Sequence, residues 1–257
     1  MIDLSEKFRL NFKDKTVLIT GGTRGIGNSL VNDFLSLGAR VISTGTSQLK
    51  IDELNEIEMK LKRGLTWILG DFSSDAGIEL FLDKLSRIQQ IDICINNAGT
   101  NKNNSLENVS KLDIDTLLNI NLKAPLLICQ TVAKSMIERS ISGKIVNIGS
   151  IWSVISKKGR SIYSTTKTGL AGFSRSIAVD LAPHGILVNV VSPGFTRTEL
   201  TEAMLTPEEI RELASQVPLN RIASTEEISK VVIFLSSNLN TFLTAQNIVV
   251  DGGFSSV

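Results

Sequence analysis

A tyrosine and a lysine four residues apart are the first residues of this 257-residue chain whose spacing could do chemistry. Tyr163, the only tyrosine, precedes Lys167 in the stretch SIYSTTKTGL at 161–170. In a helix, such residues share one face, with their Cβ atoms about 5–6 Å apart. A free phenol has a pKa near 10, and a neighbouring ammonium group lowers it. The pair could therefore give or take a proton near neutral pH, although the spacing alone also suits an ordinary surface lysine.

A serine hydroxyl lies thirteen residues before this tyrosine, in the segment KIVNIGS that ends at Ser150. The segment is predicted to be a strand, and ligands bind at the carboxyl edges of strands in open α/β sheets. We therefore expect the Ser150 and Tyr163 hydroxyls to meet over one substrate oxygen. INNAG at 95–99 ends an earlier strand, and NINL places Asn121 in the helical region that follows.

A glycine-rich loop follows the first predicted strand directly, in the segment TGGTRGIG at 20–27. Gly21, Gly25 and Gly27 allow the backbone to approach a pyrophosphate closely. The helix that follows offers unpaired amides and a favourable dipole to the same anion. A tight structural turn is the alternative, but the strand before the loop and the helix after it favour a dinucleotide site.

The end of the second predicted strand, STGTSQ at 43–48, indicates which dinucleotide would bind. An acid there would select NAD through the ribose, but Gly45 occupies that position. NADP(H) is therefore favoured and NAD(H) remains possible. The hydroxyls of Thr46 and Ser47 and the positive charge of Arg24 would bind a 2′-phosphate. Alternatively, Arg24 is merely solvated. Asp71 and Phe72 would hold the adenine, and Asp71 could equally cap a helix.

An alternating series of strands and helices is needed to bring these residues to one edge. Apolar, β-branched runs predict strands at 16–20, 40–44, 65–69, 91–95, 144–148, 186–191 and 247–250. Helical patterns fall near 25–37, 50–62, 75–88, 110–140, 160–182, 199–215 and 225–236. Such alternation predicts an α/β fold, a doubly wound parallel sheet of about seven strands with helices on both faces. We expect one domain over 1–257.

Composition and charge exclude several other classes of protein. The formal net charge is +1 with both signs mixed along the chain, so neither a nucleic-acid nor a membrane partner is predicted. Two cysteines and one histidine make neither a disulfide framework nor a metal site. The charged N-terminus lacks the apolar centre of a signal peptide, and no apolar run approaches the roughly 18 residues that span a bilayer. A cytoplasmic protein is expected.

Together these motifs resemble the short-chain dehydrogenase/reductase family over nearly the whole chain, from about Lys15 to Gly253. The matching segments follow in that family's order and spacing: TGGTRGIG, NNAG, Asn121, Ser150, YSTTK, SPGFTRT and VDGG. The resemblance implies a Rossmann-type fold and an enzyme that interconverts a ketone and a secondary alcohol by hydride transfer with NAD(P). Within the family, the chain is most similar to the 3-oxoacyl-acyl-carrier-protein reductase group.

The resemblance also implies roles for single residues. Tyr163 would be the acid/base, and Lys167 would lower its pKa and bind the nicotinamide ribose. Ser150 would polarise the substrate oxygen, and Asn121 would hold a water that links Lys167 to solvent. The implied cofactor-binding residues are Gly21, Thr23, Arg24, Gly25, Ile26, Gly27, Thr46, Ser47, Asp71, Phe72, Asn97, Ala98, Gly99, Tyr163, Lys167, Pro193, Gly194, Thr196 and Thr198.

Substrate choice is expected to depend on the segment IWSVISKKGRSIY at 151–163. Trp152 would either wall the pocket or pack in the core. The basic cluster at 157–160 could attract a carboxylate or phosphate, as on a sugar acid or an activated sugar, or could be a solvated loop. Asn101 and Lys102 would reach the same space. The candidate substrate residues are Asn101, Trp152, Arg160, Phe195 and Met204.

Two further segments are assigned. Residues 1–14 form an N-terminal extension, and the amphipathic segment 199–215 lies where the family keeps its substrate lid.

The chain departs from the 3-oxoacyl reductases at positions that concern the substrate. The 3-oxoacyl reductases carry basic residues at two surface positions that receive the acidic carrier protein, and here Ile141 and His184 stand there. Charge steering would be weaker. A sugar-like or other polar ketone is therefore an alternative to a 3-oxoacyl thioester.

A third hypothesis belongs to another class, a nucleotide-sensing module that has lost catalysis. Loss of Tyr163 or Lys167 would be its expected mark, and both residues are present. Members of the family usually assemble through their last helices and strand. The resemblance therefore implies a homotetramer, or a homodimer.

Overall fold

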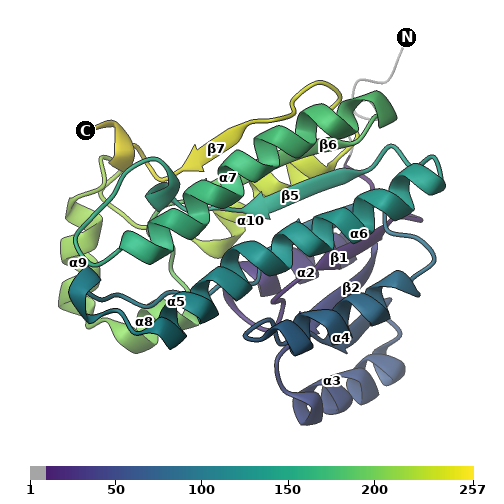
Figure 1. Cartoon of the computed structure of the whole chain (residues 1–257), viewed down its shortest axis with the longest axis horizontal. Helices are drawn as coiled ribbons and strands as arrows, with labels where there is room; N and C mark the ends of the chain where they lie inside the picture. The colour runs from purple at the N-terminus through teal and green to yellow at the C-terminus, as the bar shows by residue number, and fades with distance from the viewer. Residues whose placement is uncertain (1–9) are drawn as a thin grey trace.

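Seven parallel strands form one sheet in the part of the chain that the structure describes, which is residues 10–257 without the side chains of Leu200 and Met204. This computed structural model orders them β3-β2-β1-β4-β5-β6-β7 (Figure 1). The strands are β1 (Thr16–Ile19), β2 (Arg40–Gly45), β3 (Leu65–Leu69), β4 (Ile93–Asn96), β5 (Lys144–Ile148), β6 (Leu187–Pro193) and β7 (Asn247–Val250). The prediction of a doubly wound parallel sheet is confirmed, and the strand order reverses between β1 and β4.

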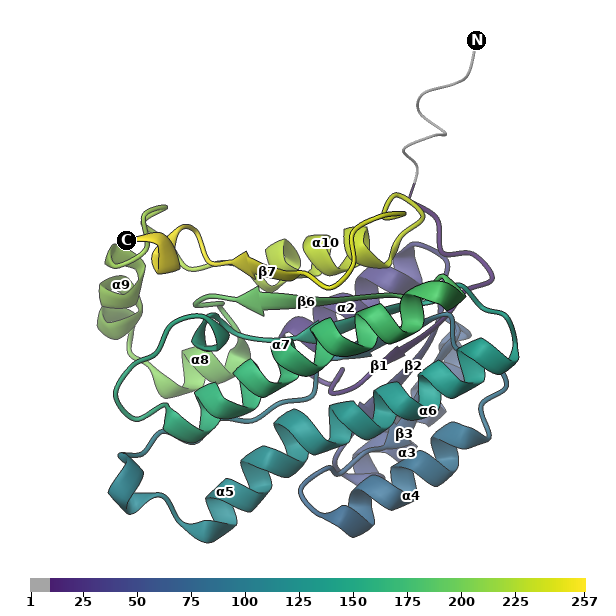
Figure 2. The same cartoon turned by 45° about the horizontal axis from the view of Figure 1, so that its top comes forward.

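Helices cover both faces of the sheet, as Figures 1 and 2 show. One face carries α2 (Gly25–Ser36), α3 (Gln48–Leu61) and α10 (Thr225–Ser236). The other carries α4 (Asp75–Ser86), α6 (Ala124–Glu138) and α7 (Ser161–Leu181). The shorter elements are α5 (Lys111–Leu118), α8 (Glu199–Met204), α9 (Pro207–Ser215), and the turns η1 (Leu106–Asn108), η2 (Asn119–Lys123), η3 (Ile151–Ser153), η4 (Ala182–His184) and η5 (Phe254–Ser256). Within the described residues, no helix has the length and apolarity of a membrane span.

Side-chain caps explain where several helices begin. The hydroxyls of Ser47, Ser74 and Ser110 accept hydrogen bonds from backbone amides in the first turns of α3, α4 and α5. The α2 helix differs, because its N-cap residue Arg24 makes no side-chain cap bond. The first amides of α2 are therefore left for another group to satisfy.

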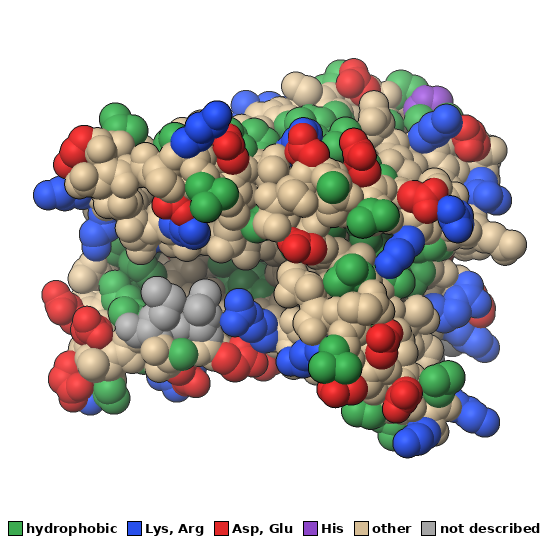
Figure 3. Space-filling view, turned by 60° about the horizontal axis from the view of Figure 1, so that its bottom comes forward, with side chains coloured by type: hydrophobic (Ala, Val, Ile, Leu, Met, Phe, Trp, Pro, Cys, Tyr) green, Lys and Arg blue, Asp and Glu red, His purple; other side chains and the backbone are tan. Residues whose placement is uncertain are grey.

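Two predicted helices are interrupted in the structure. The helical region 110–140 contains a π-helical turn, η2, between α5 and α6. The predicted helical segment 199–215 divides into α8 and α9, because Leu205 is extended and Pro207 begins a new helix with Thr206 as its cap. Figure 3 shows a hollow with hydrophobic side chains in its depth, at the end of the molecule that carries α5, α8 and α9.

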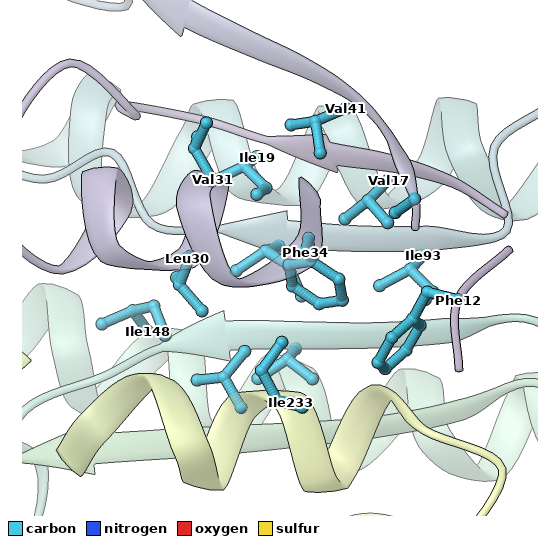
Figure 4. Packing of buried hydrophobic residues seen from close by; sticks show 14 of the residues in the cluster. Phe12, Val17, Ile19, Leu30, Val31, Phe34, Val41, Ile93, Ile148 and Ile233 are labelled. Carbon is cyan, nitrogen blue, oxygen red and sulfur yellow. The ribbon is translucent and has the colours of Figure 1, made fainter. Parts of the chain in front are cut away.

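Part of the N-terminal extension is built into the core. Phe12 is 2% exposed, and its ring meets that of Phe34 edge to face, with centroids 4.9 Å apart (Figure 4). The Phe12 amide donates to the carbonyl of Leu37 at 3.0 Å, which ties the segment to the end of α2. No role was predicted for this segment, and its apolar contacts now supply one. Residues 1–9 lie outside the described part of the chain.

Candidate active site

Ser150, Tyr163 and Lys167 come together at the carboxyl edge of β5. Ser150 lies two residues beyond that strand and Tyr163 stands in the first turn of α7. The Ser150 hydroxyl faces the Tyr163 phenol closely enough for hydrogen bonding to lower the pKa of that phenol. The Lys167 Nζ lies 5.9 Å from the centroid of the Tyr163 ring and donates to the carbonyl of Ile148 at 2.8 Å. The arrangement has the parts of an acid–base site: a phenol, a polarising hydroxyl and a buried cation.

The pKa of Tyr163 differs from the sequence expectation. Burial raises the pKa of this phenol above its ordinary value, and the hydrogen bond from Ser150 and the positive charge of Arg160 oppose that rise. Lys167 was expected to lower the pKa and is not among the groups that shift it. The physical reason is its position. The ammonium group donates to the Ile148 carbonyl, and its nitrogen lies 5.9 Å from the centroid of the tyrosine ring.

Lys167 itself is buried, with 4% of its surface exposed, and burial lowers its pKa to about 8. A chain of buried amides fixes the helix that carries it. The Asn96 side chain donates to Asn147 at 2.8 Å, and Asn147 donates to the Ser174 hydroxyl at 2.8 Å. These bonds join β4, β5 and α7, so the angle at which α7 presents Tyr163 and Lys167 is set by the sheet.

Asn121 is fully buried in the π-helical turn η2 and is committed to the neighbouring loop. Its side chain accepts from the Thr100 amide at 2.9 Å and donates to the Thr100 carbonyl at 2.8 Å. It also donates to the Thr166 hydroxyl at 3.3 Å, and Thr166 is a contact the sequence reading missed. A Cβ placed on Gly99 would lie 3.5 Å from both Asn121 Oδ1 and Lys167 Nζ. The two side chains therefore lie on the same side of Gly99.

The glycine loop is built for close backbone approach. Gly21 has a φ of +71°, and its amide donates to the Thr44 hydroxyl at 2.8 Å. A Cβ on Gly27 would stand 2.1 Å from the Gly21 carbonyl oxygen, so no side chain fits there. Asn97 donates to the carbonyls of Gly21 and of the preceding residue at 2.9 and 3.0 Å. Asn97 thus shapes the loop, while Ala98 packs against it, and Thr44 is a loop support that the sequence reading missed.

An anionic oxygen already sits on the loop. The Gly25 amide, in the uncapped first turn of α2, donates to a carboxylate oxygen of Glu199 at 2.9 Å. Thr198 lies beside it, with its methyl carbon 3.4 Å from a Cβ placed on Gly25. A phosphate oxygen, like this carboxylate oxygen, is an anionic acceptor of a hydrogen bond from a backbone amide. The loop therefore fits the pyrophosphate of a dinucleotide. Glu199 is 174 residues away in sequence, and no local pattern signalled the contact.

The adenosine end of the predicted site also fits. Gly45 closes β2 without an acid, and Thr23 lies 3.0 Å from a Cβ placed on it. Arg24 and Thr46 are exposed beside it. The Ser47 hydroxyl caps α3 by accepting from the Lys50 amide at 3.4 Å, which leaves its own proton to donate. This end of the site therefore carries one cation and two hydroxyls, the groups that a 2′-phosphate requires.

The surroundings of three other predicted cofactor residues limit what their side chains can do. The Phe72 side chain is 2% exposed and packs against Phe81 with ring centroids 5.1 Å apart, so only its backbone remains for an adenine. Asp71 does not cap α4, because Ser74 does; its carboxylate accepts from the Ser73 amide instead. The Ile26 side chain packs against the hydrophobic core on the face of the sheet that carries α2, α3 and α10, so it too can offer only backbone.

The turn after β6 brings Pro193 and Gly194 against the end of β7. Gly194 donates to the Val250 carbonyl at 2.9 Å, and a Cβ on it would meet Asp251 at 2.7 Å. Thr196 is buried and its hydroxyl donates back to Gly194 at 3.2 Å, so its side chain stabilises the turn and does not point outward as a free ligand. Of the two predicted threonines, Thr198 is the one beside the glycine loop.

An aromatic wall borders the tyrosine. The Trp152 ring meets that of Phe195 with centroids 6.5 Å apart, and the Arg160 guanidinium carbon lies 5.4 Å above the Trp152 centroid. Asn101 is exposed in the loop after β4. Lys102 was expected to reach the same space, but it pairs with Asp113 on α5. The Met204 side chain lies outside what the structure describes.

The two predicted carrier positions lie at the other edge of the sheet. Ile141 precedes β5 and packs against the hydrophobic core on the face of the sheet that carries α4, α6 and α7, and His184 is exposed just before β6. Both therefore stand at the amino edge, whereas Ser150 and Tyr163 stand at the carboxyl edge. Within one chain, these positions do not border the site.

The fold and the site define a dinucleotide-dependent oxidoreductase: a glycine loop at the first strand–helix turn, and a hydroxyl, a phenol and a buried lysine at the same sheet edge. Comparison with known proteins makes the assignment specific. The family model described as Enoyl-(Acyl carrier protein) reductase matches residues 21–255. The chain belongs to the short-chain dehydrogenase/reductase family.

Individual relatives cover nearly the whole chain. It is 37% identical to the 3-oxoacyl-acyl-carrier-protein reductase FabG of Aquifex aeolicus over 247 residues, 95% of this chain and 98% of that one. Identity to the FabG of Escherichia coli is 33% over 245 residues, again 95% and 98%. A gluconate 5-dehydrogenase from Burkholderia cenocepacia, solved with NADP and tartrate, superposes with a TM-score of 0.88 at 28% identity, covering 96% and 97%.

Proposed function

We propose that the protein is an NADP(H)-dependent oxidoreductase that interconverts a ketone and a secondary alcohol, with Tyr163 as the acid/base. The observation that carries the proposal is the meeting of Ser150, Tyr163 and Lys167 at the sheet edge that also carries the glycine loop. NADP(H) is favoured over NAD(H) because Gly45 stands where an acid would bind the ribose, and Arg24 is exposed nearby. The NADP in the Burkholderia structure agrees with this preference.

The bound dinucleotide would supply the hydride, and the protein's own groups would handle the oxygen and its proton. Ser150 and Tyr163 would hold the ketone oxygen between their hydroxyls. The high pKa of Tyr163 keeps the phenol protonated at neutral pH, which is the form needed to give a proton to the developing alkoxide. Lys167 would add positive charge beside the site, and Asn121, on the same side of Gly99, would take part in delivering the replacement proton.

The substrate is proposed from the relatives, and two classes remain. A 3-oxoacyl thioester follows from the FabG relatives, at 33–37% identity. A polar keto acid follows from the gluconate 5-dehydrogenase neighbour and from Arg160 beside the aromatic wall. The test is oxidation of NADPH followed by absorbance, with a 3-oxoacyl thioester in one series and keto sugar acids in another. If the enzyme turns over neither class of ketone, the proposed reaction is contradicted.

Further parts of the proposal concern the chain as a whole. We infer one domain over 1–257, with α8 and α9 at 199–215 acting as the substrate lid, and a cytoplasmic enzyme. A homotetramer, or a homodimer, is favoured by β7, which is half-buried along its length at the sheet edge, and by Phe242 beside it, which is 96% exposed. Light scattering would measure the mass in solution, and a monomer at micromolar concentration would contradict the assembly.

A further inference from the structure

Arg160 has an unusual position for a cation. Its side chain is half-buried at the start of α7, three residues before Tyr163. None of the ion pairs between described residues includes it, and no described side chain forms a hydrogen bond with its guanidinium. Burial lowers its pKa, so the surroundings disfavour the charge that it carries. A charge that loses water without gaining a partner is unfavourable unless an anion comes to it.

The surroundings of Arg160 hold it in one place. Its guanidinium carbon lies 5.4 Å above the centroid of Trp152, a ring that is 7% exposed and braced by Phe195. Its backbone is fixed from both sides, since the amide donates to Lys157 at 3.2 Å and the carbonyl accepts from Ser164 at 2.8 Å. Stacking on an aromatic face leaves the edges of a guanidinium group free to donate hydrogen bonds. Arg160 is thus oriented by the protein but not neutralised by it.

The charge acts on the reacting group. Among the charged groups of the described chain, Arg160 is the one that acts on the Tyr163 phenol. An anion bound to Arg160 would therefore lie on the side of the site that carries Tyr163, three residues along the chain from the proposed proton donor. The neighbouring cations Lys157 and Lys158 are exposed, and they fit the solvated loop that was the alternative interpretation of this cluster.

We propose that Arg160, held over the Trp152 ring, is the binding site for a carboxylate carried by the substrate next to its ketone, so that the enzyme acts on oxo acids. The inference rests on the proposed function for the ketone chemistry. A planar guanidinium matches the two oxygens of a carboxylate and binds them in a bidentate manner. A thioester places a neutral sulfur and carbonyl there, which would leave the buried charge unpaired.

The activity test uses a matched pair of ketones, 3-oxobutanoate and its methyl ester, which differ in the negative charge and in one methyl group. The wild-type enzyme is expected to favour the acid in kcat/KM. In Arg160→Gln the ratio of acid to ester should fall about 10- to 100-fold, the loss expected for a charge-assisted hydrogen bond. The ratio cancels any general effect on Tyr163. Arg160→Lys should recover part of the ratio, and the exposed neighbour Lys158→Gln should leave it unchanged.

A binding test reads the same site without turnover. Trp67→Phe leaves Trp152 as the only tryptophan, and Trp67 Nε1 has no hydrogen-bond partner among described residues to lose. Malonate, a dicarboxylate that cannot be reduced, is then titrated with and without NADP⁺ while Trp152 emission is followed. Affinity should fall about 10-fold or more with Arg160→Gln and stay within twofold with Lys158→Gln.

The outcomes separate the inference from the function on which it rests. Unequal malonate affinity with no turnover of either ketone would contradict the proposed reaction and keep the anion site. Turnover with an acid-to-ester ratio that Arg160→Gln does not change would overturn the anion site and keep the reaction. Equal malonate affinity in the Arg160 and Lys158 variants would also overturn it.

Discussion

The Lys167 ammonium nitrogen lies 5.9 Å from the centre of the Tyr163 ring and donates to the Ile148 carbonyl at 2.8 Å. The cation is therefore bonded to the backbone of β5 and is not paired with the phenol. Burial has opposite effects on the two groups, since it raises the pKa of Tyr163 and lowers that of Lys167 to about 8. Each shift favours the neutral form, as expected for groups removed from water.

Lys167 predicts a pH-dependent stability. The pKa of a free lysine, 10.5, falls to about 8 in the folded chain, so between these values the unfolded state binds the proton and the folded state does not. Folding stability should therefore rise with pH from about 8 to 10.5, by about 3 kcal/mol in total. Urea unfolding of wild-type and Lys167→Met proteins at pH 7.5 and 9.5 measures this, because the variant lacks the titration and both retain Tyr163. A difference between them that does not change with pH would contradict the buried ammonium.

Arg160 predicts a shift in the pH profile of the reaction. Its positive charge lowers the pKa of Tyr163, against the larger effect of burial. Removing the charge should raise that pKa, so the inflection for alcohol oxidation, in which Tyr163 must accept a proton, should move to higher pH in Arg160→Gln. The substrate for this measurement is a neutral alcohol, methyl 3-hydroxybutanoate with NADP⁺, so that anion binding plays no part. The profile of Lys158→Gln should match the wild type, and a downward shift in Arg160→Gln would contradict the electrostatic role.

Glu199 predicts a competition for the glycine loop. Its carboxylate accepts from the Gly25 amide at 2.9 Å, where a phosphate oxygen of the dinucleotide would bind. Glu199→Gln should therefore tighten NADPH binding, by about 3- to 10-fold, since a neutral amide is a weaker acceptor and does not repel a phosphate. NADPH fluorescence titration gives the affinity, and Glu202→Gln in the same short helix α8 is the control. Weaker binding in Glu199→Gln would show that the carboxylate assists the cofactor.

The sequence predicts the sheet and the reacting groups well, for physical reasons. Buried parallel strands must be apolar and β-branched, which makes runs such as TVLI and KIVNI visible in any one sequence. Tyr163 and Lys167 are local to one helix, and Ser150 ends the strand before it, so spacing alone brings them near. The glycine loop is equally local.

What the sequence does not predict depends on contacts between distant segments. Glu199 reaches Gly25 across 174 residues, and Thr44 supports Gly21 from the neighbouring strand. The direction of the Tyr163 shift follows from burial, which no spacing reveals. The break between α8 and α9 follows from Pro207, a signal present in the sequence that the amphipathic pattern of 199–215 obscured.

Replacement of Tyr163 by Phe tests the central claim most directly, because it removes one oxygen atom and keeps the ring. The measurement is NADPH oxidation with 3-oxobutanoate and with a 3-oxoacyl thioester, together with NADPH affinity by fluorescence. With Tyr163 as the proton donor, kcat should fall about 10²- to 10⁴-fold on whichever ketone the wild type reduces, while NADPH affinity stays within a few fold. Turnover that survives the substitution would contradict the assigned role and require another proton donor at this edge of the sheet.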